Sequence, residues 1–435
     1  MTAENHTVPS TTPGPGLKIE AIILAGGLGT RLREAVPDLP KCMAPVAGRP
    51  FLFYVINELQ LQGVNHFIFS LGYKHEIIES WLNVHFPRLN YEVAIEKEPL
   101  GTGGAIHLAC TKAKGKDVLV TNGDTLFRID VAAMLALHQE KKAECTLALK
   151  PMTNFERYGA VMIKDNIVNH FAEKQFYNEG LINGGIYILD KQKFESGIWP
   201  PRFSFEKDFL EPLSQSNKLA GLPQDGYFID IGIPSDYNQA QVDLAQTPIN
   251  LQKIDKSWTL FLDRDGVINE DKPDGYILNA NEFIMYDELS GKGNKKGAFK
   301  KFAELFGRII IITNQRGVGR GLMTKEDLLG IHEKLVKQVI AADGRIDHIY
   351  YCPAADKKDP GRKPNLGMAV QVKKDFPEVD FSRSIMVGNN FSDMQFGKNA
   401  GMYTVFVKTT NPGVELPYQD IDLLYNSLAD FAKGL

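Results

Sequence analysis

Hydrophobic and polar positions along the first half of the chain follow the pattern of strands that alternate with helices. Short apolar runs predict buried strands at 21–24, 66–71, 91–95 and 117–121, with shorter ones at 160–163 and 185–189. Between them, 50–62 and 74–83 carry apolar residues at helical spacing, and Pro50 suits the first position of a helix. This alternation predicts a mostly parallel α/β sheet from about Leu17 to Thr247.

The pattern restarts after a polar stretch at 248–256, which we interpret as a linker. Further apolar runs predict strands at 258–262, 308–312, 346–350, 384–387 and 403–407. The second half therefore has the residues for a core of its own, in keeping with a length of 435 residues. We predict two Rossmann-like α/β domains at 18–247 and 257–435, preceded by a disordered lead at 1–17 that is rich in Thr, Pro and Gly.

Composition narrows the class of protein. The 49 basic and 53 acidic residues nearly balance, which argues against nucleic-acid binding through bulk charge. The four cysteines lie far apart and form no CxxC pair, as expected of reduced thiols in the cytoplasm. No apolar run is long enough to span a membrane, and the first residues lack the pattern of a signal peptide. We expect a cytoplasmic protein with small-molecule substrates and no nucleic-acid or membrane partner, and a homo-oligomer stays open.

A glycine-rich loop, AGGLGTRLR at 25–33, follows the first strand. Its glycines let backbone N–H groups approach a phosphate closely, and Arg31 adds a permanent fork of donors. A simple turn is the alternative, because the loop is not a Walker motif and Leu32 replaces the third glycine of a dinucleotide fingerprint. Lys41, which follows Pro40 in a rigid turn, places one more cation nearby and favours phosphate binding.

Two later acids, Asp124 in NGDT and Asp230 in FIDIG, follow apolar runs. Mg²⁺ prefers carboxylate oxygens together with substrate phosphates, so these two acids beside the loop predict a magnesium site. Either acid alone could instead cap a turn.

The loop and the following Pro40-Lys41 resemble the signature of sugar-phosphate nucleotidylyltransferases, although Cys42 stands where that family usually has proline. The resemblance implies that the arginine and the lysine hold the triphosphate of a nucleotide, and that EKEPLGTGGAI at 96–106 binds the base. The nucleotide-binding residues it implies are Ala25, Gly26, Gly27, Gly29, Thr30, Arg31, Lys41, Gly101, Thr102 and Asp124. The sugar-phosphate residues it implies are Gly159, Glu173, Lys174 and Asn183, with Lys174 on the phosphate.

Within that family, the stretches EKEPLGTGGAI, LKPMTNFERYGAV and YFIDIGIPSDY look most like heptose 1-phosphate guanylyltransferases, over about 18–245. This implies GTP and heptose phosphates as substrates. The residues by themselves leave the base and the sugar open, so mannose 1-phosphate or UTP stays an alternative.

In the second half, FLDRDGVIN places Asp263 and Asp265 at the end of a strand. One carboxylate can attack a phosphorus atom, and the other can protonate the leaving oxygen and later deprotonate water. Thr313 ends a later strand and can donate to the phosphate, and Lys363 in GRKP can neutralise its charge. A DxD pair alone is more often a turn.

The order of these motifs over about 257–410 resembles the haloacid dehalogenase superfamily of phosphatases, most of all the heptose 1,7-bisphosphate phosphatases and next the histidinol-phosphate phosphatases. The resemblance implies Mg²⁺ and two sets of residues. The metal ligands are Asp263, Asp265, Asn389 and Asp393, and the further substrate-binding residues are Thr313, Asn314 and Arg362. Asn389 replaces the usual aspartate and is our preferred ligand over Asp393. The interval 354–361 lacks the cysteines and histidine of the usual zinc loop, so we expect no structural zinc.

Together the resemblances imply an N-terminal nucleotidyltransferase fold and a C-terminal haloacid dehalogenase-like fold in one bifunctional enzyme. One half would remove the 7-phosphate of a heptose 1,7-bisphosphate, and the other would join the heptose 1-phosphate to GMP from GTP. A regulatory subunit with one inactive half is the remaining alternative. It is disfavoured by the candidate catalytic residues, Arg31, Lys41, Asp263, Asp265 and Lys363.

Overall fold

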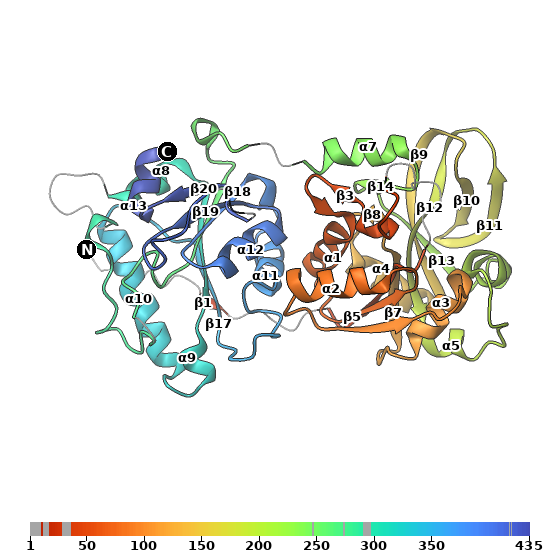
Figure 1. Cartoon of the computed structure of the whole chain (residues 1–435), viewed down its shortest axis with the longest axis horizontal. Helices are drawn as coiled ribbons and strands as arrows, with labels where there is room; N and C mark the ends of the chain where they lie inside the picture. Colours follow the sequence, from red (N-terminus) through yellow and green to blue (C-terminus); the bar gives the residue numbers. More distant parts are fainter. Residues whose placement is uncertain are drawn as a thin grey trace. The chain divides into compact units, whose positions relative to one another are not determined.

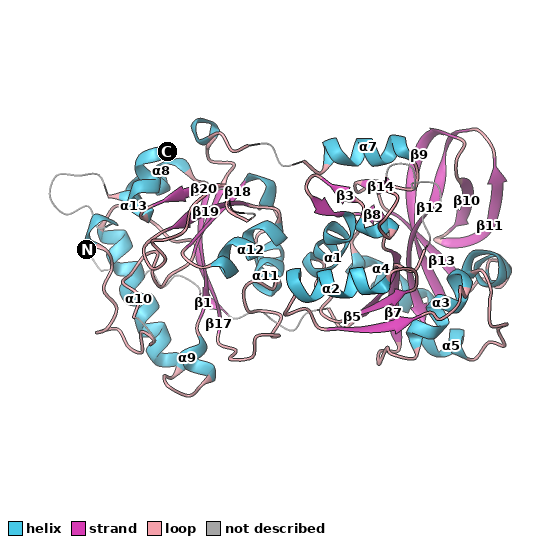
Figure 2. Cartoon of the chain, in the orientation of Figure 1, coloured by secondary structure: helices cyan, strands magenta, loops and turns pink. Residues whose placement is uncertain are grey.

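A computed structural model describes residues 10–11, 17–27, 36–245, 248–272, 275–289, 297–416, 418 and 420–435 (Figure 1). Contacts divide the chain into two units, which we call the N-terminal unit, Leu17–Gln246, and the C-terminal unit, Thr247–Leu435, the latter also containing strand β1 (Ser10–Thr11). Each unit holds its own sheet with helices against it (Figure 2), so the predicted class of two α/β domains is confirmed. In the described part of the chain, no helix has the length and hydrophobicity needed to cross a membrane.

The N-terminal unit is built on a nine-stranded sheet with the order β10-β11-β13-β9-β12-β7-β2-β5-β6. Its strands are β2 (Glu20–Leu24), β5 (Phe67–Leu71), β6 (Tyr91–Ile95), β7 (Asp117–Asn122), β9 (Cys145–Phe155), β10 (Gly159–Lys164), β11 (Ile167–Lys174), β12 (Tyr177–Asp190) and β13 (Leu219–Pro223). The four strands from β7 to β6 are parallel, as predicted. The other half is mixed, because β12 runs antiparallel to β7 and to β9.

Both faces of the parallel half are buried. Ala21 and Ile23 of β2 pack into the cluster beneath α1 and α2, whereas Ile22 packs into the cluster on the opposite face, which includes Ile106 of α3. Because successive side chains of a strand point to opposite faces, a continuous apolar run is what a doubly covered strand requires. The helices of the unit are α1 (Phe51–Leu61), α2 (His75–His85), α3 (Gly101–Cys110), α4 (Val131–Lys141), α5 (Lys191–Glu195), α6 (Glu211–Leu213) and α7 (Pro234–Asp243).

Two short antiparallel ribbons lie outside this sheet. One pairs β3 (Pro45–Val46) with β4 (Arg49–Pro50), and the other pairs β8 (Thr125–Phe127) with β14 (Phe228–Asp230). In the second ribbon Asp230 lies opposite Thr125. The ribbon therefore brings the end of β14 next to Asp124, a hundred residues away in the sequence.

The C-terminal unit is built on a seven-stranded sheet, entirely parallel, with the order β1-β17-β16-β15-β18-β19-β20. Its strands after β1 are β15 (Thr259–Leu262), β16 (Arg308–Asn314), β17 (His348–Cys352), β18 (Ser384–Gly388), β19 (Tyr403–Val407) and β20 (Leu423–Tyr425). Its helices are α8 (Ala298–Leu305), α9 (Arg316–Gly319), α10 (Lys325–Ala341), α11 (Gly367–Asp375), α12 (Phe391–Ala400) and α13 (Leu428–Gly434). The central strands β16, β15 and β18 end at one edge of this sheet, where ligands of open α/β folds bind.

The prediction of a disordered lead is wrong for Ser10 and Thr11. They extend the sheet beyond β17, where the hydroxyl groups of Ser10 and Thr11 share hydrogen bonds of 2.9 and 3.0 Å with His332 and His348. An otherwise open edge strand offers unpaired backbone groups, and this explains why a polar segment can pair there. Residues 1–9 and 12–16 of the lead lie outside the described residues.

Candidate active sites

The N-terminal unit has a pocket of about 640 Å³ at the carboxyl ends of β2 and β7. Its walls include three segments that the sequence singled out, namely the glycine-rich loop, the turn of Lys41 and the loop 96–102, together with Gly72 and Tyr73, which follow β5 and were not predicted. The lining residues among the candidate nucleotide-binding positions are Ala25, Gly26, Gly27, Lys41, Gly101, Thr102 and Asp124. The remaining three, Gly29, Thr30 and Arg31, lie outside the described residues. A volume of this size suits a small-molecule ligand such as a nucleotide.

Two glycines of the pocket, Gly26 and Gly101, lie too close to neighbouring atoms for a side chain. A Cβ on Gly26 would lie 2.7 Å from a carboxylate oxygen of Glu96, and one on Gly101 would lie 2.5 Å from the carbonyl oxygen of Phe203. Gly101 also has a φ of +72°, which side chains rarely adopt. A larger residue at either position would displace its neighbours, which explains these two glycines without reference to a ligand, whereas a Cβ on Gly27 would meet no atom within 4 Å.

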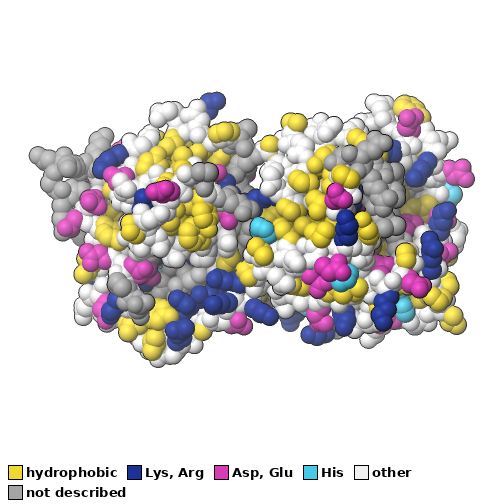
Figure 3. Space-filling view, viewed as in Figure 1, with side chains coloured by type: hydrophobic (Ala, Val, Ile, Leu, Met, Phe, Trp, Pro, Cys, Tyr) yellow, Lys and Arg dark blue, Asp and Glu magenta, His cyan; other side chains and the backbone are white. Residues whose placement is uncertain are grey.

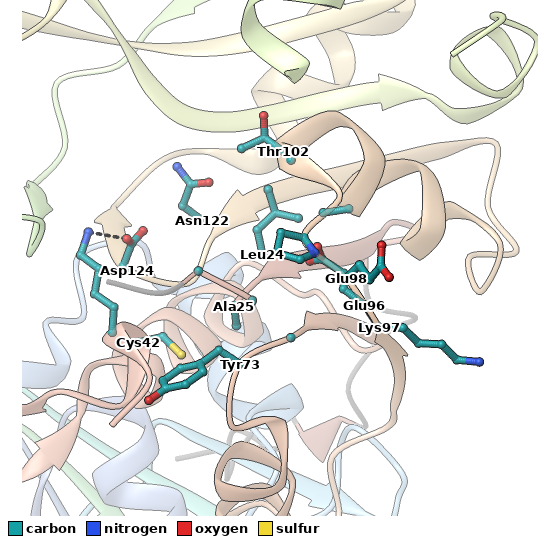
Figure 4. A pocket seen from close by; sticks show the side chains of 17 residues that line it. Leu24, Ala25, Cys42, Tyr73, Glu96, Lys97, Glu98, Thr102, Asn122 and Asp124 are labelled. Atoms are coloured by element: carbon teal, nitrogen blue, oxygen red, sulfur yellow. Dashed lines mark hydrogen bonds and ion pairs between the residues drawn. The ribbon is translucent and has the colours of Figure 1, made fainter. Parts of the chain in front are cut away.

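Lys41 joins the two predicted magnesium ligands. Its ammonium donates to Oδ2 of Asp124, shown by the dashed line in Figure 4, and lies 3.3 Å from Oδ1 of Asp230. Asp124 follows β7, and Asp230 ends β14, whose pairing with β8 sets their separation. Because one ammonium already contacts both carboxylates, their oxygens can share a single cation, as Mg²⁺ would require.

Two residues that the sequence analysis missed extend this network. Arg157, between β9 and β10, donates through Nη2 to Oδ2 of Asp230 at 3.1 Å, and through Nη1 to Asp236 in the first turn of α7. Arg157 lies in the stretch RYGAV, of which only Gly159 was chosen. The sequence signal that could have identified Arg157 is that it is the only charged residue of RYGAV, two positions before Gly159.

Cys42, the departure from the family pattern, leaves the turn intact. It lies in the 3₁₀ helix Lys41–Met43, directly after Pro40, and its side chain is buried against the pocket. Burial, with the charge of Asp124 adding to it, raises the pKa of the thiol to about 12. The side chain is therefore a neutral, protonated part of the wall.

The loop 96–102 is held together by its own polar groups. Glu96 accepts the backbone N–H of Leu100 at 3.1 Å, and burial raises the pKa of this carboxyl. The hydroxyl of Thr102 donates to Glu206 at 2.8 Å and accepts the N–H of Phe205 at 2.9 Å. The hydroxyl of Thr102 is therefore engaged in hydrogen bonds within the protein. Contacts to a nucleotide base would have to come from the backbone of Thr102.

The four candidate sugar-phosphate residues lie on three adjoining strands, and none is among the described residues that line the pocket. Gly159 of β10 pairs with Lys174 of β11, whose side chain is exposed. Asn183 of β12 donates to the hydroxyl of Tyr187 at 3.0 Å and accepts the N–H of Gly185 at 3.0 Å. Asn183 thus stabilises an irregular turn of β12, while Lys174 remains accessible to an anion. Glu173 is exposed beside it.

In the C-terminal unit, Asp263 follows β15 and is paired with the buried Lys363. The ammonium of Lys363 lies 3.0 Å from Oδ1 of Asp263 and 2.7 Å from Oδ1 of Asp393. Burial raises the pKa of Asp263 to about 7, against the opposing effect of Lys363. Burial also disfavours the charge on Lys363, but its two carboxylate partners outweigh this and raise its pKa. The contacts of the Asp263 carboxylate with Lys363 and with the backbone N–H of Arg264 both fall on Oδ1.

Asp265 accepts hydrogen bonds from three residues that were not among the predicted site residues. The fully buried Arg264 donates to both of its oxygens, at 3.0 and 2.8 Å, in a bidentate pair. Gln315 donates to Oδ2 at 2.9 Å, and Asn269 donates to Oδ1 at 3.1 Å. These donors fix the direction of the carboxylate. Both Arg264 and Gln315 are immediate neighbours of motif residues, so position alone could have suggested them.

The three candidate phosphate contacts differ in what they do. Thr313 accepts a hydrogen bond of 2.9 Å from Gln315, which leaves its own O–H to donate. Asn314 accepts the N–H of Lys363 at 3.0 Å and donates to its carbonyl at 3.3 Å, so it holds the lysine's loop. Arg362 is buried and donates to the carbonyl of Ala354 at 3.0 Å.

Asn389 and Asp393 have different surroundings. Asn389 follows β18, beside the strand that carries Asp263, and is fully buried. Its Nδ2 donates to Thr410 at 2.9 Å, but its Oδ1 has no partner among the described residues. Asp393, by contrast, uses Oδ1 for Lys363 and Oδ2 for the N–H of Asn390 at 3.0 Å. An unsatisfied buried oxygen is costly, and a cation at this position would satisfy it.

Cys352 ends β17, where the usual zinc loop would begin. Its sulfur lies 3.5 Å from Oδ1 of Asp359, and burial raises the pKa of the thiol to about 12. The described residues contain no group of three or more His, Cys, Asp or Glu side chains that could hold a metal. That the unit needs no structural zinc stays a prediction.

Comparisons with known proteins agree with the division into two units. A family model described as nucleotidyl transferase matches residues 20–247, and one described as polynucleotide kinase 3 phosphatase matches residues 278–404. These matches confirm the predicted combination of a nucleotidyltransferase domain and a phosphatase domain in one enzyme.

Curated relatives match the N-terminal half. The chain is 50% identical over 226 residues to D-glycero-alpha-D-manno-heptose 1-phosphate guanylyltransferase of Aneurinibacillus thermoaerophilus. This match covers 52% of this chain and 98% of that protein. It is 44% identical over 220 residues to the enzyme of the same name from Campylobacter jejuni, covering 50% of this chain and 97% of that protein. Mannose-1-phosphate guanylyltransferase of Mycobacterium tuberculosis is 29% identical over 234 residues, covering 53% of this chain and 65% of that protein.

Proposed function

This chain belongs to the nucleotidyl transferase family, and from that premise we propose that its N-terminal unit transfers GMP from GTP to a heptose 1-phosphate, giving GDP-heptose and pyrophosphate. The observation that carries the proposal is 50% identity over almost the whole length of a relative named for that reaction. Mannose 1-phosphate is the second candidate, because a relative named for it is 29% identical.

In the proposed reaction an oxygen of the sugar phosphate attacks the α-phosphorus of GTP, pyrophosphate leaves, and this chain's residues hold the two reactants. Lys41 can turn from the carboxylates to the triphosphate, and Lys174 can bind the sugar phosphate from β11. Arg31 would add a second cation to the triphosphate. Mg²⁺, held by Asp124 and Asp230, would neutralise charge that develops on the phosphoryl oxygens.

The C-terminal unit is proposed to remove the 7-phosphate of a heptose 1,7-bisphosphate, and so to supply the sugar phosphate that the N-terminal unit uses. Asp263 would attack the phosphorus through the oxygen that Lys363 does not hold, and the bond from phosphorus to the sugar oxygen O7 would break as Asp265, held by Arg264, gives that oxygen a proton. Asp265 would then take a proton from the water that hydrolyses the aspartyl-phosphate and releases inorganic phosphate. Lys363 would balance the charge on the nucleophile. Asp263 and the unpartnered oxygen of Asn389 fit a hard cation, so we assign Mg²⁺ to them rather than to Asp393.

Purified full-length protein should be tested with a panel of nucleoside triphosphates and sugar 1-phosphates, with pyrophosphate release as the readout. We expect the highest kcat/KM for GTP with D-glycero-D-manno-heptose 1-phosphate. Incubation with the 1,7-bisphosphate, GTP and Mg²⁺ should give phosphate, pyrophosphate and a product with the mass of GDP-heptose. A preference for another base or sugar would refute the assignment of substrates while leaving the reaction class intact.

A further inference from the structure

Arg157 and Lys41 bind different oxygens of the same carboxylate. The ammonium of Lys41 lies 3.3 Å from Oδ1 of Asp230, whereas Nη2 of Arg157 donates to Oδ2 at 3.1 Å. Oδ1 also accepts the backbone N–H of Gly232 at 2.9 Å. One oxygen of Asp230 therefore faces the cation that it shares with Asp124, and a separate cation holds the other oxygen.

Arg157 is itself fixed on two further sides. Its Nη1 donates to Asp236, and its guanidinium carbon lies 5.1 Å from the centroid of the Tyr158 ring. Burial lowers the pKa of Arg157, but the hydrogen bond to Asp236 and the nearby Tyr158 and Asp230 outweigh it and raise the pKa. The guanidinium is thus a charged, rigid fork between two carboxylates, one of them on α7.

We propose that Arg157 is a positioning residue for Asp230 as a metal ligand. The inference rests on the proposed function, because it assumes that Asp124 and Asp230 share Mg²⁺. When Lys41 turns to the triphosphate, Oδ1 of Asp230 loses its ammonium, whereas Arg157 retains Oδ2 and prevents the carboxylate from rotating. Groups that orient a metal ligand from outside typically change metal affinity about 10–100-fold.

Charge alone makes the opposite prediction, so the two explanations can be separated. Lys41 and Arg157 each place one positive charge beside Asp230, and removal of either should favour a divalent cation by electrostatics. If Arg157 acts by orientation, Arg157→Met weakens metal binding while Lys41→Met strengthens it. Opposite signs for two changes of equal charge identify positioning as the role of Arg157.

The test is Mn²⁺ binding by electron paramagnetic resonance in the full chain, with Asp263→Asn in every sample to weaken binding at the phosphatase site. We expect Arg157→Met to lower Mn²⁺ affinity about tenfold or more. Arg157→Lys should lie between, because an ammonium can still donate one hydrogen bond to Oδ2 of Asp230 but lacks the fork that also reaches Asp236. Mn²⁺ affinity equal to or above that of the parent in folded Arg157→Met overturns the proposal. The Mn²⁺ titration contains no nucleotide or sugar, so its result does not depend on the proposed substrates. If the proposed substrates are wrong, the parent protein instead fails to release pyrophosphate in the separate activity assay.

Asp236→Asn provides a second variant if Arg157→Met does not fold. It weakens the outer anchor of Arg157 but leaves the guanidinium beside Asp230, so we expect a smaller loss of Mn²⁺ affinity in the same direction. If Arg157 serves only the stability of the unit, these variants lower the unfolding midpoint and leave the Mn²⁺ affinity of the folded protein unchanged. That result also overturns the proposal.

Discussion

Lys41→Met should tighten metal binding in the absence of nucleotide, although Lys41 is expected to be essential for transfer. In the nucleotide-free site the lysine occupies the space between Asp124 and Asp230, so a divalent cation must displace it. Methionine has a similar length and shape without the charge. The variant therefore removes an internal competitor and keeps the packing of the turn.

The size of the effect follows from the exposure of the pair. At the 3.3 Å that separates Lys41 from Asp230, the gross Coulomb attraction is about 5 kcal/mol for an effective dielectric constant of 20. The three side chains are 15%, 29% and 24% exposed, however, so water screens them. Ion pairs of this kind contribute a net of roughly 0.2–1 kcal/mol each. Displacing two of them costs about 0.4–2 kcal/mol, which predicts roughly 2–30-fold tighter metal binding in Lys41→Met.

Mn²⁺ titration of parent and variant, both in the Asp263→Asn background, measures this change. A non-hydrolysable GTP analogue should show the reverse order, because Lys41→Met loses a phosphate contact. Lys150→Met is the matched control, since Lys150 is 17% exposed and pairs with Asp225 at 2.6 Å outside the pocket. Mn²⁺ affinity in Lys41→Met that equals or falls below that of the parent would refute the competition argument.

Three further changes test the remaining assignments. Asn389→Ala should raise the Mg²⁺ concentration needed for phosphate release roughly tenfold or more. Asp393→Asn should instead lower kcat, because Asp393 pairs with Lys363. If a Mg²⁺ titration of Asn389→Ala matches that of the parent, the choice of Asn389 as ligand is wrong. Asp263→Asn should abolish phosphate release and leave pyrophosphate release from supplied sugar 1-phosphate unchanged, because an amide is no nucleophile; parallel loss of both activities in folded protein contradicts separate sites. A chain truncated after Lys253 should stay soluble and transfer nucleotide, and its insolubility would mean that the units share a core.

The residues that could be predicted from the sequence are those whose chemistry is local. Asp263 and Lys41 each belong to a short motif at the end of an apolar run or a proline turn, and the fold delivers such positions to one edge of a sheet. The parallel strands β2, β5 and β7 could be predicted as directly, because residues on both of their faces are apolar and buried. Element ends differ by a residue or two where capping decides, as at α1, where Pro50 is the cap rather than the first helical residue.

The partners of those residues could not be predicted in the same way, because long-range strand pairing decides them. Asp230 meets Asp124 only through the register of β14 on β8, and Arg157 reaches Asp230 across 73 residues of sequence. The antiparallel pairing of β12 with β9 and the pairing of β1 with β17 could not be predicted either, because both depend on long-range strand pairing. A motif thus predicts which side chain reacts or binds metal, whereas the orientation of that side chain depends on residues outside any motif.

Arg157 beside Asp230 and Arg264 beside Asp265 have the same role in two unrelated sites. In each site an arginine donates hydrogen bonds to a carboxylate and so fixes the orientation that the reaction requires. Substitutions at these arginines are therefore expected to alter metal affinity and proton transfer before they alter substrate binding.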